Sequence, residues 1–280
     1  MIKPVLKWGG LFAAGVAIAN SLVLDTCFFE TNTFDIGNNE QKKKITLLLL
    51  TDVHLKKTLS PLHEKLAKRV HELQPDIILI AGDLIDKHGV AEPAEKFMAM
   101  LPQSIPKMGI MGNHDHKSEV SLQHHKQLYA QNNGVLLVNE SRKYSVAEHH
   151  ITVTGLDDYI EGEASLADAV ANVGREENHI LLIHSPKQQE KVKKQLKKIN
   201  KNREENDRLN IQYIFAGHNH GGQVRFFGYA PVMPEKSGKY MNGWYNNTPP
   251  FLYVSKGFGT TTLPFRFGAK SEITLLNLWV

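Results

Sequence analysis

Five short apolar runs divide this chain, and each of them leads directly into polar side chains. The runs are ITLLLL (45–50), DIILIA (76–81), KMGIM (107–111), HILLI (179–183) and IQYIFA (211–216). A continuous apolar run of this length is typical of a strand buried on both faces. Segments with helical spacing of apolar residues lie at 60–73, around 92–101 and at 187–199. This alternation predicts an α/β fold in which two sheets pack together, with helices outside.

The sequence signals for the remaining strands and helix ends are weaker. Short apolar stretches predict strands at 135–138 and 151–154, and the last third of the chain is rich in strands and turns. Its candidate strands are QVRFF (223–227), FLYVS (251–255) and EITLLNLW (272–279). Ser60 followed by Pro61 marks the start of the helix over 60–73, because serine caps helices and proline suits their first position.

The polar residues after the five runs form recognisable blocks: TDVH, GDLID, GNHD, HSP and GHNH. Ligands of α/β sheets gather at the carboxyl ends of the strands, so we expect these blocks to converge. Seven of their side chains are candidate metal ligands: Asp52, His54, Asp83, Asn113, His184, His218 and His220.

Seven ligands are too many for one tetrahedral ion and predict two adjacent divalent ions, the arrangement used in phosphate-ester hydrolysis. Nitrogen and oxygen ligands without a thiolate suit manganese, our first expectation, as well as iron, zinc or magnesium. On an extended chain, the alternate residues of Asp-x-His and His-x-His point to one side. Gly82, Gly112 and Gly217 precede ligands and permit tight turns and close backbone approach.

With its five blocks in the order D-x-H, G-D-x-x-D, G-N-H-D, H-x-P and G-H-x-H, the sequence resembles the calcineurin-like metallophosphoesterases over residues 45 to 280. The segments GHNHGGQVRFFG and GFGTTTLPFRFGAKSEITLLNL resemble a bacterial branch with N-terminal signal or anchor segments. The resemblance implies a two-sheet β-sandwich flanked by helices.

The resemblance also implies roles for the site residues. One metal ion is expected to take Asp52, His54, Asp83 and His220. The other is expected to take Asp83, Asn113, His184 and His218, with Asp83 bridging the two ions. His114 matches the non-ligand catalytic histidine of the family, and Asp86 matches the carboxylate that orients it.

From these roles we expect a dinuclear-metal-dependent phosphoesterase, and first a phosphodiesterase. Metal-bound hydroxide would attack phosphorus, and His114 would protonate the leaving oxygen as a general acid. The alternative is a UDP-2,3-diacylglucosamine pyrophosphatase of lipid A synthesis, whose substrate is a lipid-linked diphosphate. A non-catalytic scaffold with this fold is disfavoured, because His114 and all seven ligands are present.

The N-terminus predicts a separate unit. Lys3 and Lys7 precede an uncharged run from Trp8 to Leu24, at the short edge for a membrane span. We interpret 1–27 as an uncleaved anchor, with a signal peptide cleaved near Ala19 as the alternative. Residues 28–44 are interpreted as a linker and 45–280 as the catalytic domain. Lysines before the run predict an extracytoplasmic catalytic domain; the cytoplasmic face of the inner membrane is the alternative.

Composition excludes several classes of protein. The 33 basic and 29 acidic side chains among 280 residues give a net charge of +4, and no arginine-rich stretch is present, which argues against a nucleic-acid partner. The single Cys27 excludes an internal disulfide framework and a cysteine-based zinc site. The sequence carries no signal for the oligomeric state.

Several polar residues have two readings. Arg225 and Arg266 are candidates for a substrate phosphate or for structural pairing, and Asp115 is expected to serve only its turn. The lysine-rich helix over 187–199 is expected to be a solvated surface, with contact to anionic headgroups as the sharper reading. We place three further histidines at exposed helix positions: His116, His124 and His125.

Overall fold

Two six-stranded sheets form the centre of the molecule in a computed structural model that describes residues 8, 13, 15–17, 19, 23–37, 40, 43–146 and 148–280. The first sheet has the strand order β1 (Phe29–Gly37), β12 (Ser271–Trp279), β2 (Lys44–Leu50), β3 (Ile77–Ala81), β4 (Lys107–Ile110) and β5 (Gly134–Leu136). The second has the order β10 (Gly243–Tyr245), β11 (Phe251–Val254), β9 (Ile211–Ala216), β8 (His179–Leu182), β7 (His149–Gly155) and β6 (Glu140–Val146). Parallel and antiparallel pairs occur in both sheets.

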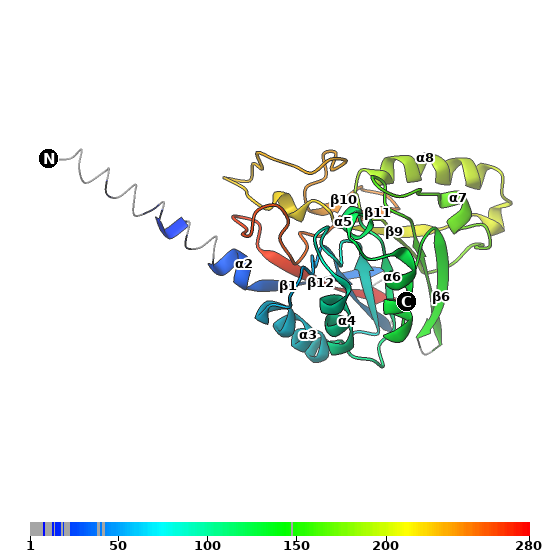
Figure 1. The fold of residues 1–280 in the computed structure, drawn as a ribbon. Coiled ribbons are helices and arrows are strands. Elements are labelled where there is room, and N and C mark those ends of the chain that lie inside the picture. Colours follow the sequence, from blue (N-terminus) through cyan, green and yellow to red (C-terminus); the bar gives the residue numbers. More distant parts are fainter. Residues whose placement is uncertain are drawn as a thin grey trace.

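Helices cover the outer face of each sheet. The helices α3 (Pro61–Leu73), α4 (Ala91–Met100) and α6 (Leu122–Gln131) pack on the first sheet, and α7 (Leu166–Ala169) and α8 (Gln188–Lys201) pack on the second. Figure 1 shows α3 and α4 on one side of the molecule and α7 and α8 on the other. The short helices α2 (Asp25–Cys27) and α5 (Asn113–Lys117) lie outside these layers. The predicted α/β sandwich flanked by helices is confirmed.

The apolar runs account for this layering. Along β2, Leu47 and Leu49 point into the core between the two sheets, whereas Leu48 and Leu50 join the core beneath the helices. All four are fully buried. Because side chains alternate across a strand, only a run that is apolar at every position can serve two cores at once.

Part of the segment that we interpreted as a linker is a strand. β1 pairs in parallel with β12 over its whole length, from Phe29 beside Ser271 to Gly37 beside Trp279. It lies at the edge of the sheet, where polar side chains are tolerated and a few apolar anchors are enough. Phe34 packs on Trp244 and Tyr253, and Ile36 is buried. The linker prediction for 28–44 is therefore wrong for 29–37.

The structure also differs from the prediction near the end of the chain. Residues 223–227 form no strand and make only isolated bridges, from Val224 to Phe267 and from Phe226 to Tyr229. The anchor or signal peptide expected over 1–27 lies mostly outside the described residues. Within the described part of the chain, no helix combines the length and the apolar character needed to cross a membrane.

Candidate metal centre

The loops that follow β2, β3, β4, β8 and β9 meet at one edge of the two sheets. Their backbones hydrogen-bond to one another beyond the ends of the strands. The N–H of Asp52 donates to Gly82 O (3.1 Å), the N–H of His54 donates to Asp83 O (3.0 Å), and the N–H of Gly217 donates to His184 O (3.1 Å). This pairing fixes the start of each polar block relative to its neighbours, so the side chains converge as the sequence predicted.

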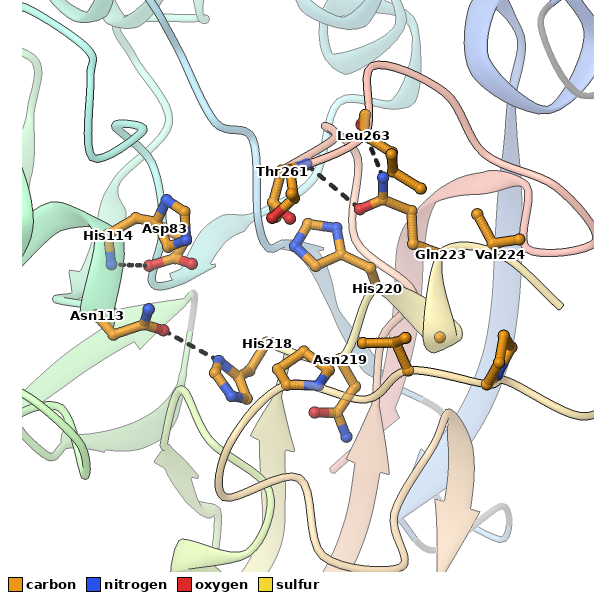
Figure 2. A pocket seen from close by; sticks show the side chains of 15 residues that line it. Asp83, Asn113, His114, His218, Asn219, His220, Gln223, Val224, Thr261 and Leu263 are labelled. Carbon is orange, nitrogen blue, oxygen red and sulfur yellow. Dashed lines mark hydrogen bonds between the residues drawn. The ribbon is translucent and has the colours of Figure 1, made fainter.

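All seven predicted ligands lie in this cluster, and each is at most 7% exposed. On one side, His220 Nε2 lies 3.1 Å from His54 Nε2 and 3.4 Å from Asp52 Oδ1. On the other side, His218 Nδ1 lies 3.0 Å from Asn113 Oδ1, a contact drawn in Figure 2.

Asp83 joins the two sides of the cluster. Its Oδ2 lies 3.5 Å from His54 Nε2 and 3.2 Å from His184 Nε2. Its Oδ1 accepts a hydrogen bond from the N–H of His114 (2.8 Å). One carboxylate oxygen therefore faces both groups of ligands.

Five of the seven ligands have a left-handed backbone. The φ angles are 52° at Asp52, 51° at His54, 52° at Asp83, 72° at His218 and 49° at His220. Our expectation of an extended chain at Asp-x-His and His-x-His is therefore wrong, because both residues of each pair have a left-handed backbone. Positive φ is unfavourable for residues other than glycine, and such strain concentrates at functional sites.

Two of the imidazoles have one ring nitrogen hydrogen-bonded to a backbone carbonyl, and a third has one ring nitrogen close to a carboxylate, which leaves the other nitrogen for a metal ion. His184 Nδ1 donates to Ala81 O (2.9 Å), and His218 Nε2 donates to Glu235 O (2.6 Å). His54 Nδ1 lies 3.3 Å from Asp86 Oδ2. The remaining nitrogen in each case faces the cluster. His184 Nε2 is buried, and it lies 3.2 Å from Asp83 Oδ2 inside the cluster.

His220 differs from the other three histidines, because its Nδ1 accepts a hydrogen bond from the Arg266 guanidinium (3.1 Å). Burial, the neighbouring His54 and the positive charge of Arg266 together hold the pKa of His220 well below its usual value. The ring therefore stays unprotonated, as a metal ligand must.

Charge favours a cation in this cluster. Burial alone would lower the pKa of His184, but the Asp83 carboxylate raises it well above its usual value. An attraction that keeps a proton on a buried imidazole would also favour a metal ion at that place. Three groups of described residues could hold an ion: Asp52 with His54 and His220, Asp52 with Asp83 and His184, and His54 with Asp86 and His114. These carboxylate oxygens and imidazole nitrogens fit a divalent metal ion.

Asp86 and His114 lie beside the cluster. Asp86 Oδ2 lies between two imidazoles, 3.3 Å from His54 Nδ1 and 3.5 Å from His114 Nδ1. Burial raises the pKa of Asp86, but hydrogen bonds from His114 and His54 outweigh it and hold that pKa below its usual range. The N–H of Lys87 also points at His114 Nδ1 (3.2 Å). His114 keeps part of its side chain exposed in a pocket.

Asp115 has a larger role than the turn that we assigned to it. Its carboxylate accepts hydrogen bonds from the N–H groups of Gly112 (2.9 Å), Ile85 (2.7 Å) and Leu84 (3.3 Å). It thus ties the loop after β3 to the loop after β4. Glycine at position 112 is needed there, because a Cβ would overlap the Asp83 carboxylate.

The weaker candidates fall outside the cluster. Arg266 is fully buried and donates to backbone carbonyls, so the structural reading of this residue holds. Arg225 donates to Gly268 O and Asn242 Oδ1. His125 is buried rather than exposed, since α6 turns it toward the core. His116 is half-buried and lies 2.7 Å from Asp157, which the sequence reading missed.

A family model described as calcineurin-like phosphoesterase matches residues 45–222, which contain all five blocks. The chain belongs to the calcineurin-like phosphoesterase family. The match covers more than half of the chain, so the resemblance seen in the sequence is confirmed at the level of family and fold.

Individual relatives share less than a third of their residues with this chain. YpbG of Bacillus subtilis (strain 168), an uncharacterized protein, is 26% identical over 284 residues, 99% of this chain and 98% of YpbG. YkuE of the same organism, an uncharacterized metallophosphoesterase, is 29% identical over 214 residues, 75% of this chain and 70% of YkuE. The solved structure of TT1561 of Thermus thermophilus has a TM-score of 0.47 at 12% identity, over 77% of this chain and 90% of that chain.

Proposed function

We propose that this phosphoesterase hydrolyses phosphate diesters with two divalent metal ions, manganese first among them. The observation that carries the proposal is the position of Asp83 Oδ2, between His54 Nε2 and His184 Nε2. A carboxylate oxygen so placed suits a bridge between two ions. One ion would take Asp52, His54, Asp83 and His220, and the other Asp83, Asn113, His184 and His218. Ions held there would lower the pKa of a water molecule to about 7 and offset charge on the phosphate.

His114 is assigned the role of general acid. His114 Nδ1 lies 3.2 Å from the backbone nitrogen of Lys87 and 3.5 Å from Asp86 Oδ2, so Nε2 is the nitrogen that would carry the acidic proton of the imidazolium. That proton is available to an oxygen in the pocket, which His114 lines together with Asp83, Asn113, His218 and His220. Proton transfer from His114 Nε2 to the leaving oxygen would complete cleavage of the P–O bond. Asp86, close to Nδ1, orients the ring.

The test is hydrolysis of bis-p-nitrophenyl phosphate by the full chain loaded with manganese, iron, zinc or magnesium. We expect turnover that Asp83→Asn abolishes and that Asp168→Asn, an exposed carboxylate on α7, leaves unchanged. Bound metal without hydrolysis of any diester would contradict the proposal. It would favour a non-catalytic scaffold. The relatives above give no support to the lipid A alternative, and we do not carry it further.

A further inference from the structure

Beside the candidate metal centre lies a cavity of about 450 Å³, a size typical of a small-molecule site. Figure 2 shows Asp83, Asn113 and His114 on one side of this cavity and Gln223, Val224 and Leu263 on the other, with His218 and His220 between them. A substrate whose phosphate lies at the ligand cluster must therefore place another part of itself against the far wall.

The apolar part of the cavity lining, the wall, consists of Val224, Pro231, Val232, Pro234 and Leu263; the polar residues Gln223, Thr261 and Thr262 also line the cavity. Val232 is 77% exposed and Leu263 is 43% exposed, so both present carbon to solvent. Exposed apolar surface that continues a binding cavity is characteristic of an interaction site.

A tight turn with exposed aromatic side chains follows Val224 in the chain. Phe226 and Tyr229 exchange two backbone hydrogen bonds, of 2.9 and 3.0 Å, around Phe227 and Gly228. Both central residues have positive φ, as in the tight turns that join twisted strands. Phe227 is fully exposed in this unfavourable conformation, and Tyr229 is 71% exposed. The cost of holding these aromatic side chains outward favours a functional role for this turn.

The wall is fixed in place before any substrate arrives. Gln223 Nε2 donates to Leu263 O (2.8 Å) and Phe265 O (3.0 Å), and Gln223 Oε1 accepts from the N–H of Thr261 (3.3 Å). The Gln223 side chain thus joins the loop that carries Leu263 to the loop that carries Val224 by hydrogen bonds. A preformed wall loses little conformational entropy on binding.

Cations are missing from this wall. None of the described side chains that line the cavity belongs to lysine or arginine. Arg225, next to the wall in sequence, is occupied by Gly268 O and Asn242 Oδ1. A second phosphate or another anionic group would therefore find no positive partner beyond the ligand cluster.

We propose that the substrate is a phosphate ester whose second substituent is an uncharged apolar group, bound on the wall of Val224, Pro231, Val232, Pro234 and Leu263. This inference rests on the proposed phosphodiesterase function and names its substrate class. The apolar group is an alkyl chain or an aromatic ring.

The experiment uses the full chain loaded with metal and a series of p-nitrophenyl alkyl phosphates, from methyl to octyl, below the concentration at which they form micelles. A fully buried methylene contributes about fourfold to affinity, so even partial burial on an open wall is expected to raise kcat/KM at least about tenfold across the series. A phenyl and a naphthyl ester in the same assay distinguish an aromatic group from an alkyl chain.

Variants locate the effect. Val232→Ser and Leu263→Ser are expected to remove most of the gain from methyl to octyl. Leu122→Ser changes a comparably exposed leucine on α6 that does not line the cavity, and it is expected to keep the full gain. A gain that survives both wall variants would contradict the assignment of the wall.

Binding gives a second readout that needs no turnover. Calorimetry with octylphosphonate and methylphosphonate is expected to show tighter binding of the octyl compound, with a negative change in heat capacity. Hydrolysis of the methyl ester with no dependence on chain length would overturn this inference alone. Failure to hydrolyse any ester with any of the metals would overturn the proposed function itself.

Discussion

Replacement of Arg266 by methionine separates the two readings that the sequence left for this residue. The guanidinium is fully buried and donates to Gly257 O (3.1 Å), Gly259 O (3.0 Å), His220 O (3.2 Å) and Ala269 O (3.1 Å). Burial lowers its pKa only to about 10, so it is charged at neutral pH. Methionine fills similar volume and leaves four carbonyls without these donors.

The expected loss follows from those four contacts. A buried acceptor left without a donor costs about 1 kcal/mol at the low end of measured values, which gives about 4 kcal/mol for Arg266→Met. For a chain of this size, that loss corresponds to a fall of roughly 10 °C in Tm. Activity is expected to fall as well, because the same guanidinium contacts His220 Nδ1.

Denaturant and thermal unfolding of the full chain measure this loss. Arg225→Met is the matched control, since Arg225 is only partly buried and its side chain donates to a single carbonyl of the backbone; we expect it to cost about 1 kcal/mol. Unchanged stability of Arg266→Met together with a raised KM would refute the reasoning, because Arg266 would then act on the substrate rather than on the loops.

Three further perturbations test other parts of the structure. His114→Gln is expected to keep its bound metal and to lose on the order of 10²–10⁴-fold in kcat; loss of metal instead would make His114 a ligand. Asp115→Ala frees three buried N–H groups and is expected to lower stability by about 3 kcal/mol in unfolding experiments, whereas a neutral result would contradict its role in joining two loops. Burial lowers the pKa of His125 and of His179 to about 4, below the value of about 6.5 in the unfolded chain. The unfolded state therefore binds more protons between pH 6.5 and 4, so the free energy of unfolding should fall as pH drops through that window, and His125→Leu should reduce the fall.

The sequence contained most of the layered core and the identity of the site. Each of the five apolar runs is a central strand, because a strand buried on both faces is apolar at nearly every position. The polar blocks after them could be placed together because parallel strands end at a common edge. These are properties of single segments and of their order, so no contact between distant residues had to be known.

Other features depend on contacts that leave no local pattern. β1 is polar at most positions and becomes a strand only because β12 offers it an open edge. Glu235 supplies a backbone carbonyl to His218, and a carbonyl has no side-chain signature. His125 is buried because α6 turns this residue toward the core, whereas its neighbours His124 and Lys126 are more exposed. The left-handed backbone at Asp52 and His54 likewise goes with hydrogen bonds to the loop after β3, which no local pattern reveals.

Metal content is the most direct test of the central claim. The full chain, loaded in turn with manganese, iron, zinc and magnesium and then freed of unbound metal, is analysed by mass spectrometry alongside Asp83→Asn. The account predicts two ions per chain for at least one metal, and loss of both in the variant, because Asp83 faces both groups of ligands. One ion per chain, or two ions that remain in Asp83→Asn, would contradict a dinuclear centre bridged by this carboxylate.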